Sequence, residues 1–232
     1  MLYDPINLQK DVWIVIPAYN EGGMIADVVA EVGAMFPNII VIDDASSDET
    51  STVARKAGAT VLRHPFNLGQ GAALQTGIEF ALSQGANHIV TFDADGQHHI
   101  EDVPVMLEQL AQSGADLALG SRFLGTTVGM SQSRGLLLKA ATLFTQITTG
   151  LKLTDCHNGL RVFTAKAAGQ LNLRQNRMAH ASEILAGIRK NRFDFVEVPV
   201  TITYSDYSKE KGQTFTDAFV IFRDLIAARL LS

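Results

Sequence analysis

The sequence predicts one α/β domain, a layered sandwich whose central sheet is mainly parallel. Short runs rich in Val, Ile and Leu alternate with helix-like stretches through the first half of the 232-residue chain. The runs are apolar at consecutive positions, which is typical of strands buried on both faces. No linker, repeat or low-complexity tract interrupts them. Alternating strands and helices imply right-handed crossovers between parallel neighbours, so we expect a single domain over residues 1–232.

The first half contains most of the predicted strands. They are expected over residues 12–16, 39–42, 60–62, 88–92 and 117–119. Ser46 and Glu49 have the spacing of a capping box, which predicts a helix over 50–57 that ends at Gly58. Another helix is expected over 103–112, because a proline lies near its start and a glycine follows its end.

The pattern loosens after Gly120. The expected elements there are an amphipathic stretch over 135–150, a helix over 183–189, a strand over 195–204 and a closing helix over 216–230. We interpret this part as a specialised C-terminal portion of the same domain.

Composition excludes several classes of protein. The chain is 47% hydrophobic and 19% charged, which is ordinary for a globular protein and unlike disordered or collagen-like chains. A single cysteine, Cys156, excludes an internal disulfide and a four-cysteine zinc site, and fits a reducing compartment. No signal peptide is visible, and no run approaches the roughly 20 apolar residues of a membrane span. We therefore expect a soluble, cytoplasmic protein.

Charge is unevenly distributed along the chain. Residues 1–119 carry 4 Lys and Arg against 16 Asp and Glu, whereas residues 120–232 carry 15 against 8. One interpretation is a chance excess of solvated charge. The other is an acidic half that holds a cation and a basic half that meets an anion.

Polar residues follow three of the predicted strands, where open parallel sheets bind their ligands. The first strand is followed by Pro-Ala-Tyr-Asn-Glu-Gly-Gly at 17–23 and the second by Asp-Asp-Ala-Ser-Ser-Asp at 43–48. The fourth is followed by Asp-Ala-Asp-Gly-Gln at 93–97. One edge of the sheet is thus expected to present an aromatic side chain and several carboxylates.

Asp93 and Asp95 are the candidate metal ligands. Two carboxylates spaced two residues apart across a turn can both point at one hard cation, with Gln97 as a further oxygen ligand. Such a cation commonly bridges phosphate oxygens of a substrate. The alternative is a merely polar turn. The adjacent pair His98 and His99 does not predict zinc, because neighbouring side chains on a loop rarely converge on one metal.

Four segments together resemble a known family. Val-Ile-Pro-Ala-Tyr-Asn-Glu at 15–21, Val-Ile-Asp-Asp-Ala-Ser-Ser-Asp at 41–48, Asn-Leu-Gly-Gln-Gly at 67–71 and Asp-Ala-Asp-Gly-Gln at 93–97 look like the ordered signatures of family 2 glycosyltransferases. The subgroup that the chain resembles is the dolichyl-phosphate mannose synthase type. The resemblance implies the GT-A fold, a Rossmann-like three-layer sandwich, and transfer of a sugar from a nucleotide donor to a polyprenyl phosphate.

The resemblance also implies roles for residues of the first half, about 1–119, as the nucleotide- and metal-binding half. The nucleotide would be bound by Pro17, Ala18, Tyr19, Glu21, Asp43, Asp44 and Ala94. Asp93, Asp95 and Gln97 would hold Mg²⁺ or Mn²⁺ against the diphosphate, which makes Asp95 a catalytic candidate. For Asp43 and Asp44 the alternative is helix capping and turn chemistry.

Residues from about 120 to 232 would form the acceptor-binding half. Arg122, also a catalytic candidate, and Arg134 would hold the acceptor phosphate, which suits a planar bidentate donor. Lys211 could contact a phosphate from a loop. The alternatives are surface salt bridges for Arg122 and Arg134, and a solvated side chain for Lys211. Asp155 and Arg161 match an Asp-x-x-x-Gly-x-Arg pattern of the subgroup and are expected to form a structural ion pair.

Two other functions stay open. One is transfer to a hydroxyl of a cell-surface glycan, with Glu183 as general base, and the other is a catalytically silent subunit that binds nucleotide sugars. A phosphate acceptor is already anionic at pH 7 and needs no base, so the lack of an obvious base favours the phosphate. The nucleotide sugar would be UDP- or GDP-linked, and no nucleic acid is expected as a partner.

The expected place of work is the inner face of a membrane. Two amphipathic stretches, 136–153 and 215–231, could either pack on the domain's own core or lie at an interface. We expect peripheral association with the membrane, through a membrane-protein partner.

Overall fold

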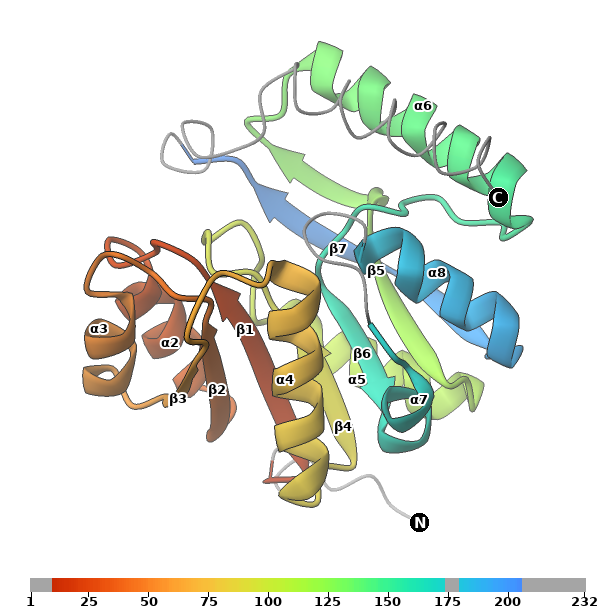
Figure 1. The fold of residues 1–232 in the computed structure, drawn as a ribbon. Coiled ribbons are helices and arrows are strands. Elements are labelled where there is room, and N and C mark those ends of the chain that lie inside the picture. Colours follow the sequence, from red (N-terminus) through yellow and green to blue (C-terminus); the bar gives the residue numbers. More distant parts are fainter. Residues whose placement is uncertain (1–9, 174–179, 206–232) are drawn as a thin grey trace.

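The computed structural model describes residues 10–173 and 180–205 (Figure 1). In this part of the chain, seven strands form one sheet in the order β3-β2-β1-β4-β6-β5-β7. The strands are β1 (Val12–Ala18), β2 (Asn38–Asp43), β3 (Thr60–Arg63), β4 (His88–Thr91), β5 (Leu117–Val128), β6 (Arg161–Thr164) and β7 (Phe195–Thr203). Strand β6 runs antiparallel to both neighbours, and the other pairings are parallel.

Helices cover both faces of this sheet. They are α2 (Ile25–Gly33), α3 (Thr50–Lys56), α4 (Gln70–Ser83), α5 (Asp102–Ser113), α6 (Gln132–Thr149), α7 (Ala165–Gln170) and α8 (His180–Asn191). Side chains of α2, α3 and α5 share one core cluster with Ile14 and Ile16 of β1. Val15 points to the other face and joins a second cluster with α4, α7 and α8. Two cores on opposite faces of one sheet make the predicted three-layer sandwich.

Helix α4 approaches the sheet unusually closely. A Cβ added at Gly77 would lie 2.3 Å from Cγ1 of Val15, so only glycine fits at this helix position. The close approach places the first residue of α4, Gln70, near the end of β4.

The predicted strands of the first half are all present, and β5 extends well beyond the predicted 117–119. The extension contains an irregularity. Four residues of β5 lie between Ser121 and Thr126, whereas one residue of β7 lies between their partners Pro199 and Thr201. Bulges of this kind redirect side chains. Arg122 lies within this irregular interval.

The structure differs from the sequence-based expectations at a helix start and at one strand, and it does not describe one expected helix. The capping box was wrong: the Oδ1 atom of Asp48 accepts the Thr50 N–H at 3.0 Å, and Ser46 bonds to Asn20 instead. Strand β6, Arg161–Thr164, was not predicted. The closing helix expected over 216–230 lies outside the described residues.

Helix α6 fills the predicted amphipathic stretch and ends at Gly150, which has the left-handed φ of 73° that favours glycine. Figure 1 shows it above the upper parts of β5 and β7, away from the layered body. Of the helices within the described ranges, none combines the length and the apolar character needed to cross a bilayer.

Candidate active site

The site lies at the edge where the parallel strands end. The ends of β1, β2, β4 and β5 reach this edge, as the sequence predicts. Because β6 is antiparallel, its first residue Arg161 pairs with Thr91, the last residue of β4. The loop before β6, residues 155–160, therefore lies at the same edge as the candidate metal ligands.

Asp95 is held in a crowded, half-buried position. Its Oδ1 accepts the Gln97 N–H at 3.0 Å and its Oδ2 accepts the Gln97 Nε2 at 2.7 Å. Burial and the nearby charge of Asp93 raise the pKa of Asp95 to about 6, and the charge of Glu21 acts in the same direction. Burial, together with the two neighbouring carboxylates, thus outweighs the effects of the Gln97 N–H and of His98, which lower the pKa of Asp95.

Asp93 is oriented by two side chains that the sequence did not assign to it. Its Oδ1 lies 3.1 Å from the Gln70 Nε2 and its Oδ2 lies 3.0 Å from the His98 Nε2. Gln70 belongs to the 67–71 segment, so this motif contacts the metal loop directly. The oxygen donors of Asp93, Asp95 and Gln97 are those that Mg²⁺ and Mn²⁺ prefer, and the raised pKa of Asp95 shows a charge that a cation would stabilise.

Asp43 is fully buried at the end of β2. It accepts the Ser46 N–H at 2.8 Å and the Ser51 hydroxyl, and it lies 3.4 Å from the Arg63 Nη1. Burial alone would raise the pKa of Asp43, but these hydrogen bonds and the Arg63 charge outweigh it and lower the pKa. The carboxylate is therefore ionised and fixed by its own turn.

Asp44 is also buried and shapes the neighbouring loop. It bonds to the Nδ1 of His64 at 2.7 Å and to the backbone N–H groups of Leu68 and Gly69 at 2.9 and 2.6 Å. These bonds fix the start of α4. The turn chemistry considered for both aspartates is thus present, and their contact with a nucleotide stays a prediction.

The remaining nucleotide candidates fall into two groups. Pro17, Ala18 and Ala94 are buried, so only their backbone could face a ligand. Tyr19 is 50% exposed at the end of β1, where its ring is available for stacking. Glu21 is half-buried, and its N–H donates to the Thr50 hydroxyl at 2.8 Å.

Arg122 and Arg134 both contact Tyr204. Arg122 is buried, and its Nε donates to the Asp155 Oδ2 at 2.6 Å while its Nη1 donates to the Tyr204 hydroxyl at 2.7 Å. The guanidinium carbon of Arg134 lies 4.8 Å from the centre of the same tyrosine ring. The two predicted phosphate ligands are thereby brought together. Lys211 lies outside the described residues.

The ion pair expected between Asp155 and Arg161 was wrong, because Asp155 pairs with Arg122. Arg161 is buried next to the metal loop, and its Nη1 has no hydrogen-bond partner among the described residues. The charges of Asp93 and Asp155 act on it, although burial still lowers its pKa. Both residues of the motif belong to the site, but not as a pair.

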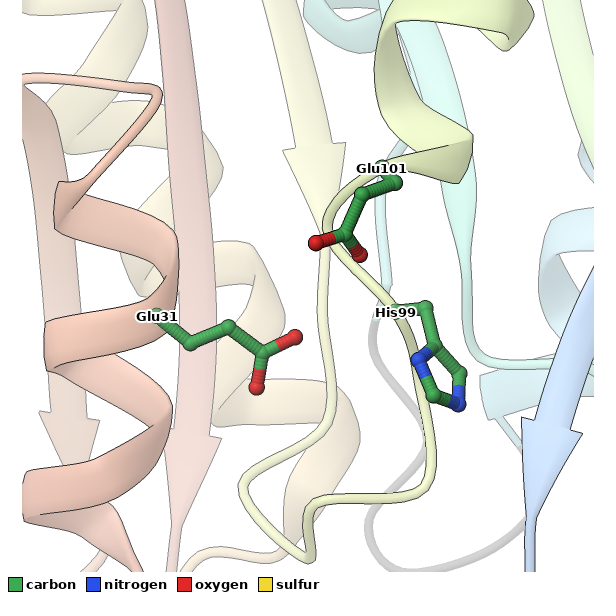
Figure 2. Close-up of side chains that lie close together, drawn as sticks. All are labelled: Glu31, His99 and Glu101. Carbon is green, nitrogen blue, oxygen red and sulfur yellow. The ribbon is translucent and has the colours of Figure 1, made fainter.

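The two adjacent histidines diverge, as the sequence indicates. His98 turns to Asp93, whereas His99 Nε2 lies 2.8 Å from the Thr203 hydroxyl. The side chain of His99 also lies close to the exposed carboxylates of Glu31 and Glu101 (Figure 2). This surface group is distinct from the Asp93 and Asp95 pair.

Three contributors to the site were missed at the sequence level. Gln70 stands inside a quoted motif, so its spacing could have pointed to it. Tyr204 is 82 residues from Arg122 in the chain, and no local pattern connects them. Gly159 is the glycine of the Asp-x-x-x-Gly-x-Arg pattern, so the motif could have pointed to it, although its contact with Asp93 depends on the fold. Glu183 is half-buried in the first turn of α8, and its role as a base stays a prediction.

Comparisons with known proteins show the family of the chain. Residues 13–171 match the family described as Glycosyl transferase family 2. A UDP-N-acetylglucosamine–dolichyl-phosphate N-acetylglucosaminyltransferase of Methanococcus voltae is 30% identical over 95% of this chain and 97% of its own. A polyprenol monophosphomannose synthase of Mycolicibacterium smegmatis is 30% identical over 88% of this chain and 83% of its own.

The solved structures show the same fold. Glucosyl-3-phosphoglycerate synthase from Mycobacterium tuberculosis, crystallised with Mn²⁺, UDP-glucose and phosphoglyceric acid, superposes with a TM-score of 0.73. The match covers 99% of this chain and 84% of that chain at 19% identity. Together, the family match, the relatives and the fold identify the chain as a glycosyltransferase with the GT-A fold that belongs to glycosyl transferase family 2.

Proposed function

We propose that this glycosyltransferase transfers a sugar from a nucleotide-sugar donor to a polyprenyl phosphate, with inversion and with Mg²⁺ or Mn²⁺. The observation that carries the proposal is the juxtaposition of an acidic and a basic group at one edge of the sheet. Asp93 and Asp95 lie beside the loop that supplies Asp155, and Asp155 holds Arg122. Two relatives are named for dolichyl phosphate and for polyprenol monophosphate, and these names support a polyprenyl phosphate as the acceptor.

On the donor side, Asp93, Asp95 and Gln97 would hold the cation against the diphosphate. The cation would stabilise the negative charge that develops on the departing nucleoside diphosphate. Tyr19 would stack on the base, because it is the half-exposed aromatic at the end of β1. The crystal complex of the M. tuberculosis enzyme with Mn²⁺ and UDP-glucose supports a metal and a nucleotide sugar in this fold.

On the acceptor side, Arg122 and Arg134 would bind the phosphate. One of its oxygens would attack the anomeric carbon and form the new C–O bond. The bond between that carbon and the diphosphate oxygen would break, and its electron pair would leave with the nucleoside diphosphate. No proton has to be removed from the nucleophile, since the phosphate monoester is anionic at pH 7.

The surface of α6 supports work at a membrane face. Leu136, Leu143 and Ile147 are 72%, 57% and 74% exposed, and their spacing of seven and four residues places them on one side of the helix. An exposed apolar stripe beside the exposed Lys139 suits the boundary between acyl chains and anionic headgroups. We therefore propose that the protein works at the inner face of a membrane, where a membrane-protein partner would add to its attachment.

The test is a turnover assay with UDP- and GDP-linked sugars, each with and without Mn²⁺, against a polyprenyl phosphate and a soluble glycan. We expect lipid-linked product of inverted anomeric configuration with one nucleotide class, and its loss in EDTA. Efficient transfer to the glycan, with none to the lipid, would replace this proposal by the hydroxyl-acceptor function. Nucleotide-sugar binding without any transfer would favour a silent subunit.

A further inference from the structure

Tyr204 occupies a fixed position between the two arginines. It follows β7 directly, is only 3% exposed, and its backbone N–H donates to the Val128 carbonyl oxygen at 2.9 Å. Its hydroxyl accepts from the Arg122 Nη1 and its ring lies under the guanidinium of Arg134. One buried side chain therefore contacts both residues, through two chemically different parts.

The hydroxyl of Tyr204 determines which edge of Arg122 remains available. Asp155 takes the backbone N–H and the Nε of Arg122 at 3.1 and 2.6 Å, and Tyr204 takes Nη1. Within the described residues, Nη2 makes no hydrogen bond, so its N–H groups remain for an anion. Burial alone would lower the pKa of Arg122, but Asp155 and Tyr204 raise it, which keeps the guanidinium charged.

The ring of Tyr204 orients the guanidinium of Arg134, which lies over its face. A guanidinium that stacks on an aromatic face keeps its N–H donors in the plane of the group, where they can reach a phosphate. Arg134 lies in the first turn of α6, whose start is capped by the Ser131 hydroxyl. The ring thus determines how an arginine of α6 is placed relative to one of β5.

The same end of β7 is bonded to the metal loop. The N–H of Thr203, the residue before Tyr204, donates to the Gln97 carbonyl oxygen at 3.0 Å, and its hydroxyl bonds to His99. Two consecutive residues therefore contact the two halves of the site. Their spacing along a strand is fixed, so the arginines keep a set position relative to Gln97.

We infer that Tyr204 is a positioning residue for the acceptor phosphate, acting on Arg122 through its hydroxyl and on Arg134 through its ring. The inference rests on the proposed function, because it takes the phosphate as the group that the two arginines bind. It makes a prediction that separates the two parts of the side chain. Tyr204→Phe removes only the contact with Arg122, whereas Tyr204→Leu removes both contacts.

The first measurement is steady-state kinetics with a polyprenyl phosphate. Loss of one hydrogen bond to a charged group raises the acceptor KM by roughly 10-fold in Tyr204→Phe. Tyr204→Leu raises it further, and both variants keep the donor KM within about twofold. A merely structural role would change both KM values alike, so equal effects on donor and acceptor would overturn the inference.

A double-mutant cycle with Arg134→Gln tests the second contact. In the presence of Arg134, Tyr204→Leu should weaken acceptor use more than Tyr204→Phe does. In the Arg134→Gln background that difference should disappear, because no guanidinium remains to stack. A difference of the same size in both backgrounds would show that the ring does not act through Arg134.

Val198→Ala is the matched control, because Val198 is a buried residue of β7 that pairs with Gly120, six residues before Tyr204. It should lower the melting temperature without a selective rise in the acceptor KM. A selective rise in this variant would overturn the inference, since loss of strand packing would then explain the Tyr204 effects.

Calorimetric binding of a short-chain prenyl monophosphate separates failure of the inference from failure of the proposed function. In one outcome, the wild type binds the prenyl monophosphate more tightly than Tyr204→Phe does and yet transfers no sugar to it. That result would support the inference and reject the proposed function. Equal binding by both proteins would overturn the inference alone. No binding by the wild type would overturn both.

Discussion

The backbone of Gly159 lies directly against the carboxylate of Asp93. A Cβ at position 159 would come within 2.1 Å of the Asp93 Oδ2, which is closer than any real contact. The Thr91 hydroxyl donates to the Gly159 carbonyl oxygen at 2.6 Å, so the loop is held in this position. The loop before β6 is therefore part of the wall around the candidate metal ligand.

Gly159→Ala should damage metal use without unfolding the protein. The added methyl group must displace Asp93, and disturbing the support of a metal ligand costs about 10- to 100-fold in metal affinity. The measurement is turnover as a function of Mn²⁺ concentration. Gly169→Ala is the control, because its Cβ would meet only Leu82 at 3.9 Å. An unchanged Mn²⁺ midpoint in Gly159→Ala would show that Asp93 does not bind the metal.

Asp95→Asn should abolish turnover and yet stabilise the metal-free protein at pH 7. Folding raises the pKa of Asp95 from 3.8 to about 6, chiefly through burial and the charge of Asp93. A carboxyl group whose pKa is raised in the folded state lowers stability as pH rises from about 4 to 6, and the loss persists above that range. The uncharged amide removes this unfavourable charge.

Thermal unfolding in EDTA checks this prediction at pH 5 and pH 7.5. The variant should melt higher than the wild type at pH 7.5, and the difference should shrink at pH 5. Mn²⁺ should raise the melting temperature of the wild type much more than that of the variant. Because Glu31, His99 and Glu101 could bind Mn²⁺ weakly at the surface, Glu31→Gln serves as the control for nonspecific stabilisation. A variant that melts lower at pH 7.5 would contradict the prediction.

The sequence was sufficient for the layered fold and for the edge at which the site lies. Both depend on local patterns, namely apolar runs of strand length and the polar residues that follow them. Contacts between distant segments were not predictable in the same way. Asp155 and Arg161 share a motif, yet Asp155 pairs with Arg122, which is 33 residues away in the chain. Tyr204 likewise gains its role only when β7 pairs with β5.

Tyr19→Ala should weaken donor binding and leave the chemical step almost intact. A stacking contact on a base is worth about 1–3 kcal/mol, which corresponds to roughly a 10-fold rise in the donor KM. The contact is present in both ground and transition states, so kcat at saturating donor should stay near the wild-type value. Asp43 is a poorer probe, since it is fully buried and its removal would take the acceptor from the Ser46 N–H and the Ser51 hydroxyl.

Steady-state kinetics over a wide range of donor concentration checks the role of Tyr19. Tyr19→Phe is the control, because it keeps the ring and should behave like the wild type. A normal donor KM with a large loss of kcat in Tyr19→Ala would assign the residue to the chemistry instead of the base.

The exposed stripe of α6 should determine membrane association. Replacing Leu136, Leu143 and Ile147 together with serine removes apolar side chains that are more than half exposed, so the effect on folding stability should be small. Transfer of each leucine or isoleucine side chain from water to an apolar medium contributes about 1.5–3 kcal/mol of binding free energy, so the triple variant should lose most of its binding to vesicles.

The measurement is co-flotation with anionic liposomes that contain a polyprenyl phosphate. Nucleotide binding, followed by melting shift, should match the wild type. Replacing the exposed Val105 on α5 gives a control for loss of apolar surface elsewhere. If the triple variant, the Val105 control and the wild type all float with the liposomes to the same extent, α6 is not the surface that meets the membrane.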